Sequence, residues 1–270
     1  GGFVDAAGTR HARTGGEARI VSLVPSLTEL VCDLGLAGQL VGRTGFCVHP
    51  RELVRSVRKV GGTKDVDLDK LRSLKPTHAI LNVDENRKED ARALAEFVPV
   101  LIVTHPLSPL DNPALYRLIG GIFGRDAEAE ALCGRFKEAY EALRSSAGAL
   151  QAERVLYLIW RNPWMTVSRD TYVSRMLALV NWQTVPSDGA ERYPKIDLDG
   201  EALDQARTVL LSSEPFMFRE KHLAEMRACP ELRGKRIELI DGEMTSWYGS
   251  RAIKGLAYLR RFRGELDGAP

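Results

Sequence analysis

The sequence predicts an α/β protein of two Rossmann-like lobes that are joined by one long rigid α-helix, with a ligand cleft between the lobes. Two observations predict this fold. Short apolar runs alternate with loops and helical patterns on both sides of residues 126–151, and such alternation is typical of parallel sheets covered by helices. Residues 126–151 themselves have the periodicity of a single long helix. The alternative is one doubly wound domain, in which that helix packs across a sheet like any other.

The long helix is predicted from apolar residues that recur every three or four positions without a proline. They are Leu132, Phe136, Ala139, Leu143, Ala147 and Leu150. Asp126 can cap its start, and Glu128 and Glu130 lie where a helix N-terminus favours negative charge. At about 1.5 Å per residue such a helix spans roughly 35–40 Å, the width of a small domain.

The domains follow from the position of this helix. Residues 1–18 are polar and glycine-rich and predict a flexible N-terminal arm. Residues 19–124 form the first lobe, 125–151 the connecting helix and 152–270 the second lobe. In the first lobe, residues 20–24 predict a buried strand, and Ser26 to Glu29 have the pattern of a capping box for the next helix. In the second lobe, residues 154–160 begin the same alternation, and Asp170 or Ser168 is expected to cap the helix of residues 171–180.

Composition excludes several classes of protein. The 270 residues are 44% hydrophobic and 27% charged, with a net charge of +2, which is ordinary for a globular protein and gives no reason to expect nucleic acid. No apolar run is long enough for a membrane span, and residues 1–18 lack the apolar core of a secretory signal. The missing signal leaves two expectations open. If a leader was removed, the protein belongs in the periplasm or cell envelope, and otherwise it belongs in the cytoplasm. No dimerisation stripe is evident, so a monomer is expected.

Ligands of open α/β sheets bind beyond the carboxyl ends of the strands, and the loops expected there are rich in aromatic and charged residues. Aromatic side chains on polar loops commonly mark a recognition surface. The predicted ligand-binding residues are Phe46, Cys47, His49, Lys64, Glu85 and Asn86 in the first lobe, and Trp160, Trp164, Arg169, Tyr193, Glu214, Phe216, Glu243, Trp247, Tyr248 and Arg251 in the second. Trp182, at a helix end, is expected to pack in the core.

Neither a metal site nor a catalytic site is predicted. Cys47 and His49 are soft metal ligands two positions apart, but two ligands do not make a site. Gly61 to Lys64 resemble part of a phosphate loop without its full spacing, and the sequence has no nucleophile elbow, zincin or dinucleotide-binding motif. The four cysteines form no C-x-x-C pair. No catalytic cofactor is expected. An enzyme that uses Glu85, Glu214 and Glu243 for acid–base chemistry is the least favoured alternative.

Several motifs carry a resemblance to a known family. The segments RIVSLVPSLTEL, VGGTKD and DGEMTSWYGSR resemble the helical-backbone substrate-binding proteins of vitamin B12 and iron-siderophore ABC importers, above all their cobalamin-binding branch. The likeness runs from Arg19 to Phe262. It implies a non-enzymatic protein that captures a corrinoid or another metal chelate, such as an iron chelate, and delivers it to a permease. A cytosolic metal- or cofactor-binding protein of the same fold without a permease is the alternative.

The resemblance also implies roles for particular residues. Phe46, Trp164, Tyr193, Asp241 and Trp247 fall where the family places ligand contacts. The family presents one acidic residue per lobe to arginines of the permease, and Asp69 and Asp199 correspond to that pair, with Glu201 as a rival; each could equally be an acid of a helix N-terminus. The chain departs from the enteric cobalamin binders in lacking an aromatic residue at GGTK and in its charged ENRKED loop. The motifs FCVHP, ENRKED and SEPF-x-F resemble a subgroup of metal receptors.

Overall fold

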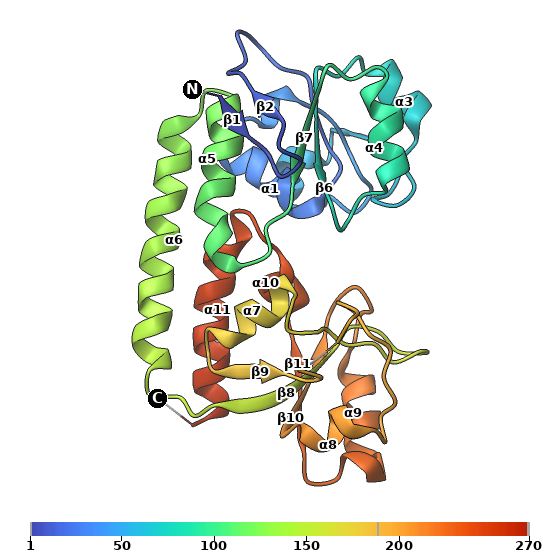
Figure 1. Ribbon diagram of the computed structural model, residues 1–270, viewed down its shortest axis with the longest axis vertical. Helices are drawn as coiled ribbons and strands as arrows, with labels where there is room; N and C mark the ends of the chain where they lie inside the picture. The colour runs from blue at the N-terminus through green and yellow to red at the C-terminus, as the bar shows by residue number, and fades with distance from the viewer. Residues whose placement is uncertain (1, 188, 269–270) are drawn as a thin grey trace. The chain divides into compact units, whose positions relative to one another are not determined.

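The computed structural model describes residues 2–187 and 189–268, which form two compact units (Figure 1). Unit 1 contains the described residues up to Pro106, then Leu110–Phe136 and the short segment Tyr248–Arg251. Unit 2 contains Leu107–Pro109, Lys137–Trp247 and the described residues from Ala252 onward. Each unit has its own parallel sheet, as the alternation of strands and helices predicts. The predicted cleft stays a prediction.

Unit 1 is built on a five-stranded sheet with the order β5-β4-β3-β6-β7, in which every neighbouring pair is parallel. Its strands are β3 (Ile20–Ser22), β4 (Leu40–Arg43), β5 (Arg58–Lys59), β6 (His78–Asn82) and β7 (Val100–Thr104). All five residues of β6 are buried, which fits a strand covered on both faces. The helices of this unit are α1 (Pro25–Asp33), α2 (Arg51–Val54), α3 (Leu68–Ser73), α4 (Lys88–Ala95) and α5 (Asn112–Ile122), with the 3₁₀ turns η1 (Ala37–Gln39) and η2 (Pro109–Asp111), of which η2 begins in unit 2.

The N-terminal segment differs from the expected flexible arm. Strands β1 (Phe3–Val4) and β2 (Arg10–His11) pair as an antiparallel hairpin. The buried Asp5 carboxylate accepts hydrogen bonds from the backbone of the hairpin and from the Val103 amide, and it pairs with His11 Nε2 at 2.9 Å. The Phe3 ring packs against Gly121 of α5 so closely that a Cβ at Gly121 would lie 2.1 Å from it. A buried carboxylate therefore orders a segment that composition alone indicates to be loose.

Unit 2 is built on a four-stranded parallel sheet with the order β11-β10-β8-β9. Its strands are β8 (Glu153–Leu158), β9 (Trp182–Thr184), β10 (Thr208–Ser212) and β11 (Arg236–Ile240). The helices are α7 (Tyr172–Ala178), α8 (Glu201–Gln205), α9 (Glu220–Ala228), α10 (Gly242–Ser246) and α11 (Arg251–Leu266), with the turn η3 (Pro230–Leu232). The core position of Trp182 is confirmed: it is fully buried, with the Arg263 guanidinium 5.0 Å from its ring centroid.

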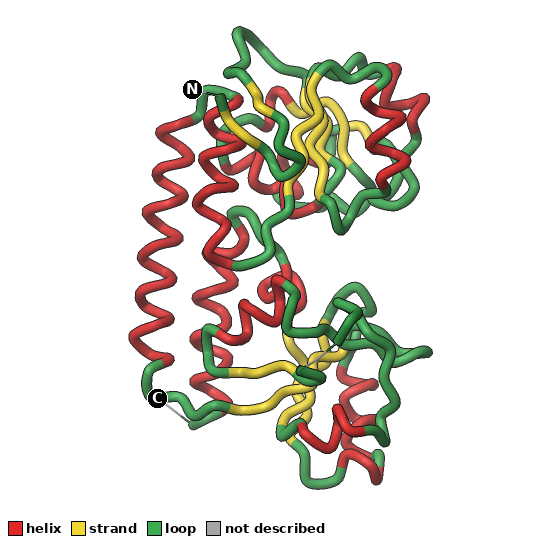
Figure 2. The backbone as a smooth tube through the Cα atoms, in the orientation of Figure 1, coloured by secondary structure: helices red, strands yellow, loops and turns green. Residues whose placement is uncertain are grey.

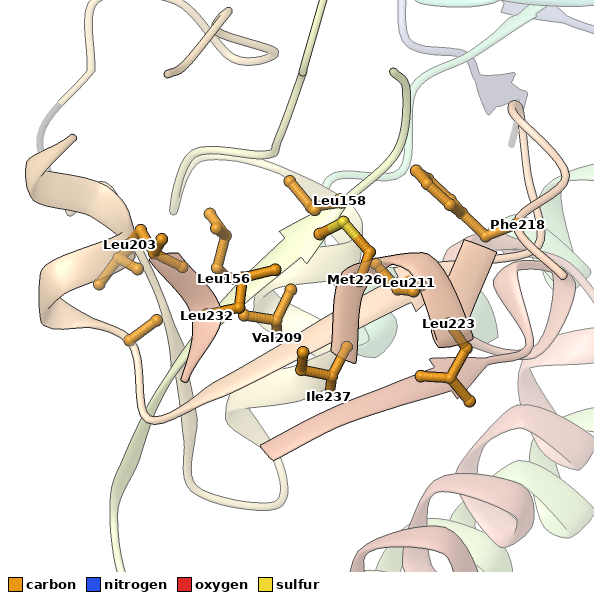
Figure 3. Packing of buried hydrophobic residues seen from close by; sticks show 12 residues of the cluster. Leu156, Leu158, Leu203, Val209, Leu211, Phe218, Leu223, Met226, Leu232 and Ile237 are labelled. Carbon is orange, nitrogen blue, oxygen red and sulfur yellow. The ribbon is translucent and has the colours of Figure 1, made fainter. Parts of the chain in front are cut away.

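The apolar cores lie between the sheets and their helices. In unit 2, Leu156 and Leu158 of β8, Val209 and Leu211 of β10 and Met226 of α9 belong to one buried cluster (Figure 3). In unit 1, the corresponding cluster joins Val21 of β3, Leu23 directly after it, Ala79 and Leu81 of β6 and Leu94 of α4. These clusters hold each sheet rigid beneath the loops at its carboxyl edge.

The long helix is α6 (Asp126–Ala147), one continuous helix of 22 residues in the backbone trace (Figure 2). Its residues up to Phe136 belong to unit 1, and those from Lys137 onward belong to unit 2. It ends four residues before the predicted end at Gln151, directly before Gly148, a residue that favours helix termini. No helix in the described part of the chain is long and apolar enough to cross a membrane.

Two predicted helix caps are wrong. Helix α1 begins at Pro25 after Val24, without a side-chain cap, because the fixed φ of proline suits the first helical position; Ser26 therefore lies inside the helix. Helix α7 is capped by Thr171, whose hydroxyl accepts a hydrogen bond from the Ser174 amide at 3.2 Å, rather than by Asp170 or Ser168.

Candidate functional site

Each sheet has a point where the strand order reverses, and ligands of open α/β sheets bind at such points beyond the strand ends. In unit 1 the chain runs outward from β3 to β4 and β5 and returns to β6, so the point lies between β3 and β6. In unit 2 the equivalent point lies between β8 and β10. Seven of the seventeen residues that the sequence singles out follow these strands: Glu85, Asn86, Trp160, Trp164, Arg169, Glu214 and Phe216.

In unit 2 the two loops at this point form a continuous row of aromatic rings, here called the aromatic ledge: Trp160, Trp164, Phe216 and Phe218. Trp160 follows β8 and Phe216 follows β10, and their ring centroids lie 5.7 Å apart. Phe216 is 4.7 Å from Phe218, which in turn stacks on Trp164 at 6.2 Å with the planes 6° apart. Phe218 is buried, whereas Trp160 is 38% exposed. The ledge is thus anchored in the core by Phe218, and its open end at Trp160 can receive a flat apolar face.

Backbone hydrogen bonds fix the loops that carry the ledge. The loop after β8 folds back on itself, since Ile159 N donates to Met165 O at 2.9 Å and Met165 N donates to Trp160 O at 3.1 Å. Phe216 N then donates to Ile159 O at 3.2 Å and joins the loop after β10 to the loop after β8. The side chains of the ledge are therefore positioned before any ligand arrives, which lowers the entropy cost of binding.

A charged network supports the same edge of unit 2. Glu214, in the loop after β10, accepts hydrogen bonds on Oε1 from Trp247 Nε1 at 2.6 Å and from the Ser246 hydroxyl at 3.1 Å. Asp241 caps α10 by accepting a bond from the Met244 amide at 3.2 Å. Glu243 lies in the first turn of that helix. The network fixes the orientation of the half-buried Trp247 indole.

Two further predicted residues of unit 2 are Tyr193, in the connection after β9, and Arg169, later in the loop after β8. Tyr193 is 42% exposed, and the Arg192 guanidinium lies 5.6 Å from its ring centroid. The exposed Arg169 donates from Nε to Thr184 O at 3.4 Å, at the end of β9.

In unit 1, Phe46 is the exposed aromatic residue of the loop after β4. It is 66% exposed, and its ring lies over Gly62 of the next loop, where an added Cβ would be 3.3 Å away. Cys47 is fully buried between Thr28 and Thr44, with both hydroxyl oxygens 3.1 Å from its Sγ. Burial raises the pKa of the Cys47 thiol. Cys47 and the half-buried His49 thus lie in different environments, and the described residues contain no group of three potential metal ligands.

Asn86 lies at the point of strand reversal in unit 1 and ties three loops together. Its amide nitrogen donates to Leu23 O and to Thr63 O, each at 3.1 Å, and its oxygen accepts from the Asn82 amide at 2.9 Å. Lys64 donates from Nζ to Asp84 O at 2.7 Å. Asn86 is buried, and its hydrogen bonds hold the loops in place. Lys64 is exposed at the surface of these loops.

Glu85 and Arg251 also bind partners within unit 1. Tyr248 donates its hydroxyl proton to Glu85 Oε1 at 2.6 Å, and burial raises the pKa of the Glu85 carboxyl despite that bond. Arg251 forms a forked, buried ion pair with Glu29, with Nε–Oε2 at 2.8 Å and Nη2–Oε1 at 3.1 Å. The structure therefore gives Arg251 a structural contact at a position where the sequence predicts a ligand contact.

The structure brings together one set of residues from the aromatic and charged loops and adds one residue from a helix. Trp160, Trp164, Phe216, Glu214 and Trp247 lie on joined loops of unit 2. Phe218 and Arg161 of the same loops belong with them, and His222 is added from α9. The Arg161 guanidinium lies 5.4 Å from the Trp164 ring centroid and pairs with Glu225, and the His222 ring lies 5.3 Å from that of Phe216. The SEPF-x-F motif is the signal that points to Phe218, whereas His222 lies inside α9 and has no sequence signal.

The two acidic residues of the predicted permease contact are exposed. Asp69 lies in the first turn of α3, which is capped by Asp67 through a 3.0 Å bond from the Lys70 amide, so capping does not require Asp69. Asp199 precedes α8, whose N-cap is Gly200. Glu201, the rival residue, accepts a bond from Gln205 at 2.8 Å.

Comparison with known proteins identifies the family. The profile of the periplasmic binding protein family matches residues 20–234. The chain belongs to this family. The match covers both parallel sheets except β11, together with α6 and the loops of the aromatic ledge.

Individual members of the periplasmic binding protein family are distant relatives. The vitamin B12-binding protein of Pectobacterium carotovorum is 22% identical over 199 residues, which are 73% of this chain and 72% of that protein. Among solved structures, the periplasmic vitamin B12 binding protein BtuF of Vibrio cholerae has a TM-score of 0.79 at 15% identity, covering 93% of this chain and 98% of that chain. The periplasmic heme-binding protein BhuT in complex with two hemes has a TM-score of 0.81 at 20% identity, covering 93% and 99%. These structures show that the fold is shared.

Proposed function

We propose that the protein is a non-enzymatic substrate-binding protein that captures a flat metal chelate, a corrinoid or a porphyrin-like iron chelate, for an ABC importer. The observation that carries this proposal is the aromatic ledge at the carboxyl ends of β8 and β10. Its rings are positioned by backbone hydrogen bonds, and Trp160 at its open end is accessible. Aromatic side chains bury a large area at low entropy cost, which suits a rigid planar ligand.

The family supports the class of ligand. Relatives and structural neighbours of this chain are named for binding vitamin B12 and heme, and both ligands present a broad macrocycle. In unit 2 the proposed binding surface includes Tyr193 and Trp247 in addition to the ledge. The ligand is cargo and not a catalytic cofactor, and the protein acts outside the cytoplasm as a monomer.

Isothermal titration with cyanocobalamin, heme and a ferric siderophore tests the proposal. One of them should bind with a one-to-one stoichiometry and without conversion to a product. Trp160→Ala should weaken that binding by at least about tenfold. Truncating an aromatic residue that carries much of the binding energy costs about 2 kcal/mol or more, and about 1.4 kcal/mol corresponds to a tenfold change in Kd. Tyr140→Ala is the matched control, since Tyr140 is an aromatic residue of α6 outside the ledge.

Three results would count against the proposal. Absence of binding to every planar chelate would remove the ligand class. An equal loss of affinity in Trp160→Ala and Tyr140→Ala would remove the ledge as its site. Turnover of a bound ligand would favour the enzyme alternative, in which Glu85, Glu214 and Glu243 act as acids or bases.

We further propose that Asp69 and Asp199 contact arginines of the importer. Both carboxylates are exposed, and charged groups at such positions direct association more than they hold the fold. Asp69→Lys/Asp199→Lys should leave chelate binding unchanged and reduce uptake by the intact importer. Unchanged uptake would refute this docking role, while a loss of chelate binding would show that the substitutions act on the protein itself.

A further inference from the structure

A hollow in unit 1 has a strongly basic lining. It has a volume of about 440 Å³ and is lined by Arg43, Val48, Arg51, Val54, Arg55 and Lys59. Four of these six side chains are cationic, and the described lining contains no carboxylate. This basic hollow shares no residue with the aromatic ledge or with the proposed docking residues.

The secondary structure brings these cations together. Arg43 is the last residue of β4 and Lys59 is the last residue of β5, and the two are paired in register across parallel strands. Paired residues of neighbouring strands project from the same face of a sheet. Helix α2, in the connection between these strands, supplies Arg51 and Val54, and Arg55 follows at its C-cap. The crossover from β4 to β5 therefore places four positively charged side chains around the same hollow.

Arg43 is held as a fixed donor at the base of this space. Its residue is only 4% exposed. Nε donates to Val54 O at 2.7 Å and Nη1 donates to Thr44 O at 3.1 Å. Nη2 forms no hydrogen bond with the described residues, and it is not one of their buried side-chain atoms that lack a partner. This nitrogen is therefore accessible to an acceptor from outside the protein.

The other cations surround that fixed group and are exposed. Arg51 and Lys59 form no ion pair among the described residues, and Arg55 has only the solvent-exposed contact with Glu52 at 3.4 Å. Guanidinium forks match phosphate and carboxylate oxygens in pairs, and Lys adds a mobile point charge. The volume falls in the range of small-molecule pockets, and Val48 and Val54 supply an apolar wall.

We propose that the basic hollow is a binding site for a small oxyanion with at least two negative charges, such as a phosphate ester. Arg43 anchors one oxygen through Nη2, and Arg51, Arg55 and Lys59 neutralise the remaining charge. None of its lining residues belongs to the aromatic ledge, since they lie at the β4–β5 edge of unit 1. The same phosphate chemistry can come from a soluble anion or from a lipid headgroup.

Calorimetric titration of the full chain with pyrophosphate tests the site, with sodium chloride at the same ionic strength as the reference. Saturable one-to-one binding of pyrophosphate is expected, together with a rise in Tm that chloride does not produce, since a ligand that binds only the folded state stabilises it. The variant Arg51→Gln/Lys59→Gln should raise the Kd at least about tenfold. The control Arg92→Gln/Arg135→Gln removes the same charge from exposed helical positions in unit 1 and should bind like the unaltered protein.

Flotation with vesicles of phosphatidylglycerol distinguishes the two sources of the anion, with phosphatidylcholine vesicles as the reference. Binding to the anionic vesicles that is lost in Arg51→Gln/Lys59→Gln but kept in the control supports the site with a lipid headgroup as its ligand. Saturable pyrophosphate binding that is lost in Arg51→Gln/Lys59→Gln but kept in the control supports the site with a soluble anion as its ligand. An equal response to chloride, equal losses in the two double variants, or no binding to either probe would overturn the proposal.

Discussion

Replacing Arg251 by methionine should destabilise unit 1 by about 3–5 kcal/mol, the usual cost of removing one partner from a buried ion pair. The side chains of Arg251 and Glu29 are only 9% and 6% exposed, and two charge-assisted bonds of 2.8 and 3.1 Å join them. Methionine keeps the unbranched stem but removes both donors. The Glu29 carboxylate is then left inside the protein without a cation, which is the main source of the cost.

The geometry also determines what a second substitution does. In Glu29→Leu/Arg251→Met both charges are replaced by apolar groups, and no ion remains unpaired. Apolar replacement of a whole buried pair is often close to neutral. The double variant should therefore be more stable than Arg251→Met alone, and the coupling energy between the sites should reach about 2 kcal/mol or more.

Hydrogen exchange of the β6 amides measures the free energy of opening in unit 1 separately from unit 2. The exposed Arg135 of α6 provides the control Arg135→Met, which should change that free energy by less than about 0.5 kcal/mol. A loss below about 1 kcal/mol in Arg251→Met, as for a surface pair, would refute the structural role. The structural role would also be refuted if the stability losses from the substitutions at Glu29 and Arg251 were simply additive in the double variant. The ion pair further predicts that chelate affinity is retained below the unfolding temperature; a large loss would support a ligand contact at Arg251.

Three further predictions concern the rest of the fold. Burial opposes ionisation of Glu153, but bonds from Thr208 and Arg263 outweigh it and lower the pKa of the carboxyl from 4.5. Its contribution to stability is thus present above about pH 4.5 and is lost as the pH falls through the lowered pKa; acid unfolding of Glu153→Gln should show a smaller pH dependence. Gly121→Ala should displace the N-terminal hairpin by collision with Phe3 and increase its proteolysis, and Phe3→Ala should relieve the collision. Leu211→Ala, at a fully buried position, should cost about 2–5 kcal/mol in urea unfolding; a cost below 1 kcal/mol would contradict the packing in Figure 3.

The sequence is sufficient for the elements whose signals are local. The alternation of strands and helices, the continuous helix after Asp126 and the buried position of Trp182 all follow from residue spacing within short windows, because an apolar face must recur at the period of its helix or strand. The aromatic residues of the loop after β8 are predictable for the same reason. They follow an apolar strand and lie in a polar loop, where their exposure is unusual.

The contacts that complete the sites depend on segments far apart in the chain. Arg251 meets Glu29 across 222 positions and Asn86 meets the Leu23 carbonyl across 63, and no pattern within either segment indicates its partner. The basic hollow forms because parallel pairing places Arg43 beside Lys59 while α2 folds between them.

Local spacing therefore determined the elements, their apolar faces and the aromatic loops of this protein. Tertiary structure alone decided which charged side chains are paired and buried and which surround an open space, because the cost of desolvating a charge depends on every segment that packs around it.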